Sequence, residues 1–152
     1  MTGLPSAVLF ACTMNSVRSP MAEALLKHIH GKRVFVDSAG VKTKEVDPFA
    51  VEVLKEIGID LSRHQGKTFD DLDDDSFDVI ISLSPEAQHR AVEITRTIAC
   101  DIEYWPTFDP TIAIDGNRES RLNAYRELRD HLKAKILQRF PPDAPKSTNV
   151  TP

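Results

Sequence analysis

Short, almost wholly apolar segments alternate with amphipathic stretches along most of this chain. The runs at 7–11 ("AVLFA") and 77–83 ("FDVIISL") are typical of strands that are buried on both faces, as in a parallel sheet. Between such runs apolar residues recur at helical spacing, and Ser19-Pro20 and Asp47-Pro48 are typical helix starts, with an N-cap residue followed by proline. We expect strands at 7–11, 33–38, 77–83 and 101–104, and helices at 19–30, 48–57, 85–97 and 122–136.

Strands that alternate with helices form βαβ units, in which the strands are parallel and the crossovers right-handed. The sequence therefore predicts an α/β fold of three layers, with a central four-stranded parallel sheet and helices on both faces. In such folds ligands bind beyond the carboxyl ends of the strands. We expect a single domain over residues 1–140. The segment 141–152 is rich in proline and has no periodicity, so we expect it to be disordered.

Composition and charge argue against several classes of function. The chain has 152 residues and a net charge of −4, without a basic cluster that would indicate nucleic acid or membrane as a partner. No run is long enough to span a membrane, and no targeting segment is evident. The histidines lack metal-ligand spacing, so we expect no metal site. Two cysteines far apart do not make a disulfide framework, which favours a reducing cytoplasm.

The stretch "CTMNSVRSP" (12–20) lies between the first expected strand and the first expected helix. A loop that enters a helix N-terminus aims several backbone N–H groups at one point, and the helix dipole adds partial positive charge. Cys12 at the base of this loop would be stabilised as a thiolate by these donors and a nearby cation. Arg18 supplies the cation and can bind two oxygens of a tetrahedral oxyanion, while Ser19 can donate its hydroxyl to the sulfur. This combination predicts nucleophilic catalysis on a phosphate-like group.

The longer stretch "VLFACTMNSVRSPMAEALL" resembles the phosphate-binding loop of the low-molecular-weight protein tyrosine phosphatases, whose fold is shared by thioredoxin-coupled arsenate reductases. The similarity covers residues 7 to about 140 and continues in five later segments: "DSAG" (37–40), "IGIDLSRH" (57–64), "FDVIISLS" (77–84), "WPTFDP" (105–110) and "AYRELRD" (124–130). The resemblance implies a low-molecular-weight phosphatase-like fold. It also implies hydrolysis of phosphomonoesters, phosphotyrosine proteins among them, through a cysteinyl-phosphate and without a metal or cofactor.

The resemblance also implies roles for individual residues. Cys12 would be the nucleophile, Arg18 would bind the phosphate, and Asp109 would be the general acid that protonates the leaving oxygen. The loop that binds the phosphate would comprise Thr13, Met14, Asn15, Ser16, Val17, Arg18 and Ser19.

Four positions, two of them within the loop, would support its conformation and the sulfur. Asn15 would hold its strained conformation, since a left-handed backbone suits asparagine better than most residues. Ser38 and His64 match family positions that support the Asn15 side chain, and Ser19 would hydrogen-bond the sulfur.

Some positions depart from the family pattern. Met14 stands where glycine is usual, and Val17 where a second loop cysteine is frequent, so no backup disulfide can form within the loop. Thr111 and Ile112 follow the Asp-Pro pair in place of aromatic residues. Aromatic side chains at the entrance of such a site hold a phosphotyrosine ring. Their absence here leaves the phosphate chemistry intact but removes the basis for tyrosine specificity.

Two other functions use the same residues. Arsenate fits the same cradle, but its reduction needs a resolving thiol, and the segment after the third strand ("SPEAQHR") has Ser84 and no cysteine. Such a reductase would therefore depend on an external thiol. A phospho-ligand binding module would not need both Cys12 and Asp109. The expected ligands are a phosphorylated protein or small phosphoester, together with the oxyanions phosphate, vanadate and arsenate.

Overall fold

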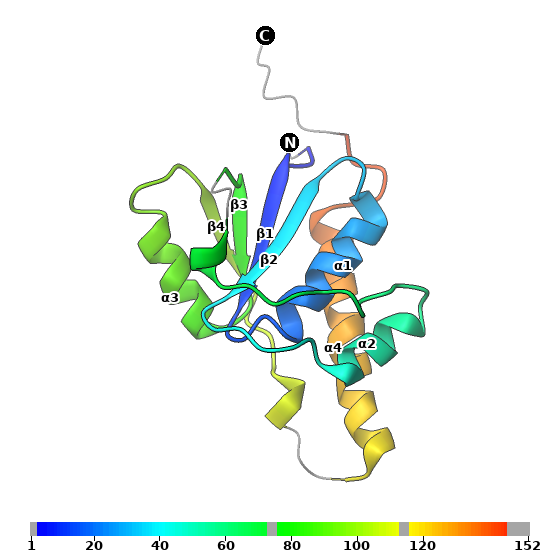
Figure 1. Cartoon of the computed structure of the whole chain (residues 1–152). Helices are drawn as coiled ribbons and strands as arrows, with labels where there is room; N and C mark the ends of the chain where they lie inside the picture. Colours follow the sequence, from blue (N-terminus) through cyan, green and yellow to red (C-terminus); the bar gives the residue numbers. More distant parts are fainter. Residues whose placement is uncertain (1–2, 73–75, 113–115, 146–152) are drawn as a thin grey trace.

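A central sheet of four parallel strands organises the molecule (Figure 1). The computed structural model describes residues 3–72, 76–112 and 116–145. The strands are β1 (Ala7–Cys12), β2 (Phe35–Gly40), β3 (Val79–Ser82) and β4 (Asp101–Tyr104), and their order in the sheet is β2-β1-β3-β4. All neighbouring pairs are parallel, as the sequence predicts.

Helices cover both faces of the sheet, which confirms the expected three layers. They are α1 (Arg18–His30), α2 (Pro48–Lys55), α3 (Pro85–Ile94) and α4 (Arg118–Arg139), with short 3₁₀ helices η1 (Phe69–Asp71) and η2 (Pro110–Ile112). In Figure 1, α1, α2 and α4 lie on one face and α3 on the other. In the part of the chain that the structure describes, no helix combines the length and apolar character needed to cross a membrane.

Strand β1 contributes to the core on both of its faces. Val8 and Phe10 belong to the cluster that packs with α1, α2 and α4, whereas Leu9 and Ala11 belong to the cluster that packs with α3. Successive side chains of a strand point to opposite faces. Burial on both faces is therefore the reason that this strand is almost entirely apolar.

Several expected boundaries differ from the observed ones by a few residues, and for β2 and α1 tertiary contacts explain the difference. Strand β2 spans Phe35–Gly40 instead of 33–38, because it pairs with β1 along the whole length of both strands. Helix α1 begins at Arg18, with Val17 at the N-cap and no side-chain cap. Ser19 is therefore not the cap, and its hydroxyl contacts the Cys12 sulfur instead.

The end of the described chain packs against its beginning. The backbone N–H of Leu4 donates to the carbonyl of Pro145 (2.8 Å), and Ala144 is buried in the core. The His30 imidazole lies 3.0 Å from the Phe140 carbonyl oxygen. Residues 141–145 of the segment expected to be disordered thus make defined contacts, and 146–152 lie outside the described residues.

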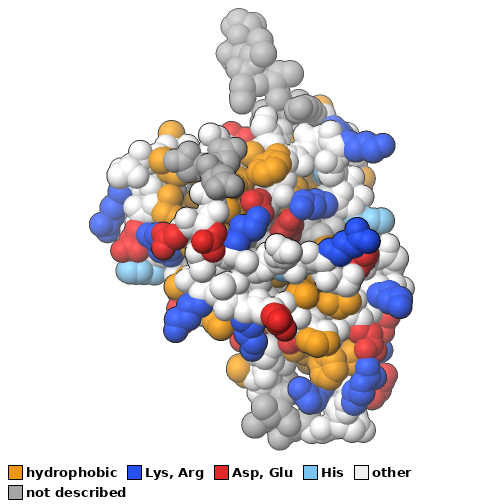
Figure 2. All heavy atoms as spheres, viewed as in Figure 1, with side chains coloured by type: hydrophobic (Ala, Val, Ile, Leu, Met, Phe, Trp, Pro, Cys, Tyr) orange, Lys and Arg blue, Asp and Glu red, His pale blue; other side chains and the backbone are white. Residues whose placement is uncertain are grey.

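Charged side chains are interspersed on the face seen in Figure 2. Lysine and arginine alternate there with aspartate and glutamate, and no single basic patch covers this face.

Candidate active site

The carboxyl end of β1 leads into a small cavity of about 40 Å³. This cavity brings together the three residues expected to carry the chemistry, Cys12, Arg18 and Asp109, from β1, α1 and the segment after β4. The remaining lining residues are Met14, Ser16, Val17, Lys44 and Thr111. The position agrees with the rule that ligands of parallel sheets bind beyond the carboxyl ends of the strands.

Three hydrogen-bonding groups contact the sulfur of Cys12. The Ser19 Oγ lies 2.8 Å from Sγ, and the backbone N–H groups of Asn15 and Ser19 donate to it at 3.3 and 3.4 Å. Hydrogen bonds of this kind stabilise the anionic form of a thiol, which is the nucleophilic form. Only 2% of Cys12 is exposed, and the residue lines the cavity.

Arg18 connects the loop to the segment after β4. Its Nη1 donates to the carbonyl oxygen of Thr107 (2.9 Å), and its Nη2 lies 3.9 Å from Oδ2 of Asp109. The other carboxylate oxygen of Asp109 accepts hydrogen bonds from the backbone N–H (2.9 Å) and the hydroxyl (2.7 Å) of Thr111. The carboxylate is thus fixed at the cavity, with one oxygen facing the arginine.

Asn15 is the buried centre of the loop. Its backbone has a φ of 50°, the left-handed region, and its side chain is completely buried. The amide nitrogen Nδ2 donates to the hydroxyls of Ser19 (2.9 Å) and Ser38 (3.0 Å). The amide oxygen Oδ1 accepts from the backbone N–H of Lys67 (2.9 Å) and from Nε2 of His64 (3.1 Å). The structure therefore brings Ser38 and His64 to this side chain, as expected from the resemblance.

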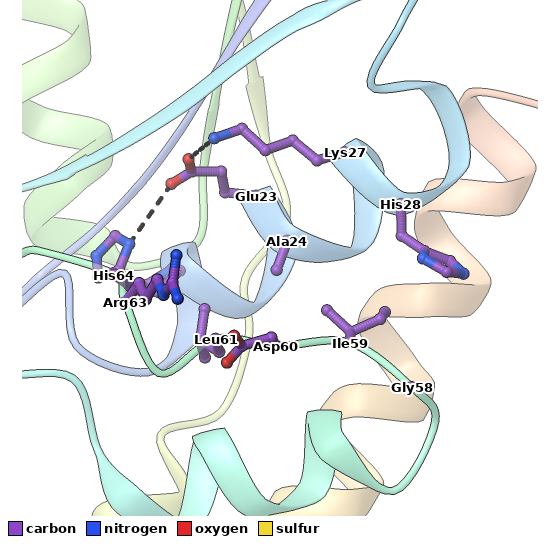
Figure 3. Close-up of a pocket in the computed structure, with 11 residues that line it drawn as sticks. Glu23, Ala24, Lys27, His28, Gly58, Ile59, Asp60, Leu61, Arg63 and His64 are labelled. Carbon is purple, nitrogen blue, oxygen red and sulfur yellow. Dashed lines mark hydrogen bonds and ion pairs between the residues drawn. The ribbon is translucent and has the colours of Figure 1, made fainter.

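Glu23 is part of this hydrogen-bond network, and the sequence analysis did not identify it as a site residue. Its carboxylate accepts hydrogen bonds from the Ser38 hydroxyl and from the Lys27 ammonium, each at 2.5 Å, and it lies 3.8 Å from Nδ1 of His64 (Figure 3). Burial lowers the pKa of His64, and the Glu23 carboxylate partly opposes this effect. Glu23 and Lys27 stand four residues apart on α1, the usual spacing of a surface ion pair, so the sequence alone gives no sign that Glu23 is buried.

Glycine at the end of β2 allows the loop to approach the sheet. A Cβ on Gly40 would lie 2.7 Å from the backbone nitrogen of Asn15, which is closer than real Cβ contacts. The last residue of "DSAG" must therefore lack a side chain for the loop to keep this position.

The second thiol of the chain lies near the amino ends of the strands, whereas Cys12 lies at the carboxyl end of β1. Cys100 directly precedes Asp101, the first residue of β4. Asp101 pairs with Val79 of β3, and Val79 pairs with Val8 of β1. Cys12 is four residues beyond Val8, a separation of about 13 Å along the strand at about 3.3 Å per residue. A disulfide requires Cα atoms within about 7 Å, so these two thiols cannot pair in the folded chain.

The position beside the loop that could hold a resolving thiol is taken by a hydroxyl. Ser84 follows β3, and its Oγ accepts a hydrogen bond from the hydroxyl of Thr13 at 3.0 Å. Burial raises the pKa of Cys100, which makes it a poor thiolate at neutral pH. Within the described ranges, no three histidine, cysteine or acidic side chains are grouped so that they could hold a metal ion.

Comparison with known proteins agrees with this geometry. The family model described as low molecular weight phosphotyrosine protein phosphatase matches residues 7–148. Arsenate reductase 1 of Staphylococcus epidermidis is 34% identical over 132 residues, which cover 85% of this chain and 91% of that protein. The glutaredoxin arsenate reductase of a Synechocystis species is 32% identical over 130 residues, covering 85% and 92% of the two chains. The solved structure of a low molecular weight protein tyrosine phosphatase from T. tengcongensis has a TM-score of 0.68 at 29% identity and covers 89% of this chain and 99% of that chain.

Proposed function

Because this chain belongs to the low molecular weight phosphotyrosine protein phosphatase family, we propose that it is a phosphatase that hydrolyses phosphomonoesters through a cysteinyl-phosphate. One observation carries the proposal. The Cys12 sulfur, which accepts hydrogen bonds from two backbone N–H groups and contacts the Ser19 hydroxyl, shares a cavity of about 40 Å³ with the Arg18 guanidinium and the Asp109 carboxyl group. This arrangement supports the proposal, because the reaction needs a nucleophile, a group that binds the oxyanion and a proton donor close to one another.

The reaction follows in two steps. The Cys12 thiolate attacks the phosphorus, a sulfur–phosphorus bond forms, and the bond from phosphorus to the leaving oxygen breaks as Asp109 gives that oxygen a proton. Asp109, now a carboxylate, then takes a proton from a water that attacks the phosphorus and releases phosphate and the thiolate. Arg18 and the loop N–H groups stabilise the charge on the equatorial oxygens in both steps.

A second candidate is the reduction of arsenate with an external thiol, which the names of the two curated relatives favour. In this reaction Cys12 would displace water from arsenate and form a sulfur–arsenic bond. A small thiol such as glutathione would then attack the Cys12 sulfur, leaving a mixed disulfide and arsenite, so that two thiols lose the two electrons that arsenic gains. The serine at position 84 and the distant Cys100 argue that the second thiol would come from outside the chain.

The substrate and setting complete the proposal. We expect a phosphorylated protein or a small phosphoester as substrate, and phosphate, vanadate and arsenate as ligands of the loop. Both cysteines are free thiols, which supports a reducing compartment such as the cytoplasm.

One experiment separates the two candidates. The hydrolysis of p-nitrophenyl phosphate and the reduction of arsenate are measured on the same purified protein, with and without glutathione–glutaredoxin and thioredoxin systems. Cys12→Ser should lose ester turnover while it still binds phosphate or vanadate, because a serine hydroxyl is not ionised in this environment. Ester hydrolysis that persists in Cys12→Ser would refute the cysteinyl-phosphate, and thiol-dependent arsenite formation without ester hydrolysis would favour the reductase.

A further inference from the structure

The segment 41–47, which we call the rim loop, is held over the cavity at both ends. The backbone N–H of Lys42 donates to the carbonyl of Thr13 (2.9 Å), and that of Asp47 donates to the carbonyl of Ser16 (3.0 Å). Both acceptors belong to the phosphate-binding loop. The rim loop is therefore tied directly to the loop that would bind the substrate.

The middle of the rim loop is fixed by a close approach to Gly66. A Cβ at position 66 would collide with the Thr43 side chain and would lie 2.8 Å from the carbonyl oxygen of Lys44. The absence of a side chain at this glycine lets the two backbones pack together. Lys44 consequently starts from a fixed backbone position at the edge of the cavity.

Lys44 adds a positive charge to the cavity, and binding of the scissile phosphate does not require this charge. It lines the cavity together with Arg18, which can bind the transferred phosphate by itself. Two other lysines near the loop have partners, since Lys27 pairs with Glu23 and Lys67 with Asp37. The Lys44 ammonium has no hydrogen bond or ion pair with any residue that the structure describes.

The acidic groups nearby do not neutralise this lysine. Asp109 lines the same cavity, but its carboxylate is already held by Arg18 and Thr111. Glu45 follows Lys44 in the rim loop and lines a neighbouring hollow, and no ion pair joins these two among the residues that the structure describes.

The neighbouring hollow offers space for the rest of a substrate. It has a volume of about 580 Å³, and it shares Lys44 with the small cavity. Its lining contains no phenylalanine, tyrosine or tryptophan; it is formed by Thr43, Lys44, Glu45, Val46, Ser62, His64, Gln65 and Gly66. An anionic group of the substrate would meet the free Lys44 ammonium here.

We propose that Lys44 is a specificity-determining residue that binds a second anionic group carried by the substrate next to its scissile phosphate. This inference rests on the proposed phosphatase function and adds the class of substrate. The second anion is a carboxylate or phosphate of a small phosphoester, or an acidic side chain beside the phosphorylated residue of a protein.

The test compares two esters that differ only in charge. We measure kcat/KM for 3-carboxyphenyl phosphate and for phenyl phosphate, whose leaving groups are similar. The wild type should prefer the carboxylated ester by about fivefold, the range of an exposed ion pair, and the preference should shrink at high salt. Lys44→Gln should abolish the preference, and Lys44→Glu should reverse it. Lys42→Gln, which removes the same charge from an exposed side chain outside the cavity lining, should keep it.

A binding measurement separates failure of this inference from failure of the proposed function. If no ester is hydrolysed, the phosphatase proposal fails, but calorimetry with 3-carboxybenzylphosphonate and benzylphosphonate still tests Lys44 without turnover. The carboxylated ligand should bind more tightly to the wild type and to Lys42→Gln, but not to Lys44→Gln. Equal affinities in the wild type, or the same preference in Lys44→Gln, would overturn the inference.

A third arm identifies the source of the second anion. Phosphotyrosine peptides with glutamate beside the phosphorylated residue are compared with matched glutamine peptides. A Lys44-dependent preference for the glutamate peptides indicates a protein substrate, and a preference confined to the carboxylated ester indicates a small phosphoester. Absence of a Lys44-dependent preference in every arm refutes the role of Lys44.

Discussion

Replacing Asn15 by alanine should destabilise the whole domain as well as its phosphate-binding loop. The substitution removes the only acceptor of the Lys67 backbone N–H and the partner of His64 Nε2 among the described contacts. An unsatisfied group of this kind costs about 1–3 kcal/mol, and we count the lower end, about 1 kcal/mol, for each of the two groups as a minimum. Alanine must also adopt the left-handed φ of 50°, which costs about 1 kcal/mol more.

These contributions sum to about 3 kcal/mol, a large part of the 5–15 kcal/mol that typically stabilises a domain. With a urea slope of about 2 kcal/mol per molar, the unfolding midpoint should fall by about 1.5 M. Asn15→Gly separates the two causes, since glycine tolerates the positive φ but loses the same hydrogen bonds. It should recover about 1 kcal/mol relative to alanine.

The assay is equilibrium unfolding in urea, followed by circular dichroism and by Trp105 fluorescence, with phosphate binding measured on the same samples. A loss of less than about 0.5 kcal/mol in Asn15→Ala would refute the reasoning, because the hydrogen bonds would then carry no net stability. Wild-type stability in Asn15→Gly would show that only the backbone conformation matters.

Three further outcomes are expected. Asp109→Asn should slow hydrolysis by about 10²–10⁴-fold for esters with poor leaving groups and much less for p-nitrophenyl phosphate, so a uniform loss below about threefold across a leaving-group series would remove it from the mechanism. Peroxide should inactivate Cys12 without forming a bond to Cys100, and peptide mapping that finds this disulfide in folded protein would contradict the strand register. Burial lowers the pKa of His64 below its unfolded value of about 6.5, so the unfolded state binds more protons there and the free energy of unfolding should fall as the pH drops below about 6.5. In His64→Gln the free energy of unfolding should fall less steeply between pH 7.5 and 5.5 than in the wild type. Urea unfolding midpoints that change with pH equally in the two proteins would contradict the assignment of this pH dependence to His64.

The parts of the site that could be predicted are local in the sequence. Cys12, Arg18 and Ser19 stand within eight residues, and a strand followed by a helix start fixes how they meet. The cap assignment of Ser19 failed because capping preference describes an isolated helix, whereas here the sulfur of Cys12 competes for the hydroxyl. Ser38 and His64 could be named only through the family resemblance, since nothing near them in the sequence connects them to Asn15.

The residues that were missed look like ordinary surface positions. Glu23 and Lys27 stand four residues apart, a spacing that is common for ion pairs on exposed helix faces. Only the packing of α1 against β2 reveals that the Glu23 carboxylate is buried. Lys44 is one of several charges in a loop without periodicity. Its importance depends on the close approach of Gly66, which is about twenty residues away in the chain and has no local signal.

The bonds that tie the rim loop to the phosphate-binding loop all come from main-chain atoms. Backbone amides at 42 and 47 donate to backbone carbonyls, so these ties place no demand on side-chain identity except that proline is excluded at both positions. Residues 43–46 can therefore be exchanged without removing these ties. Preference for one substrate over another can diverge, in nature or by grafting, while the catalytic chemistry is inherited intact.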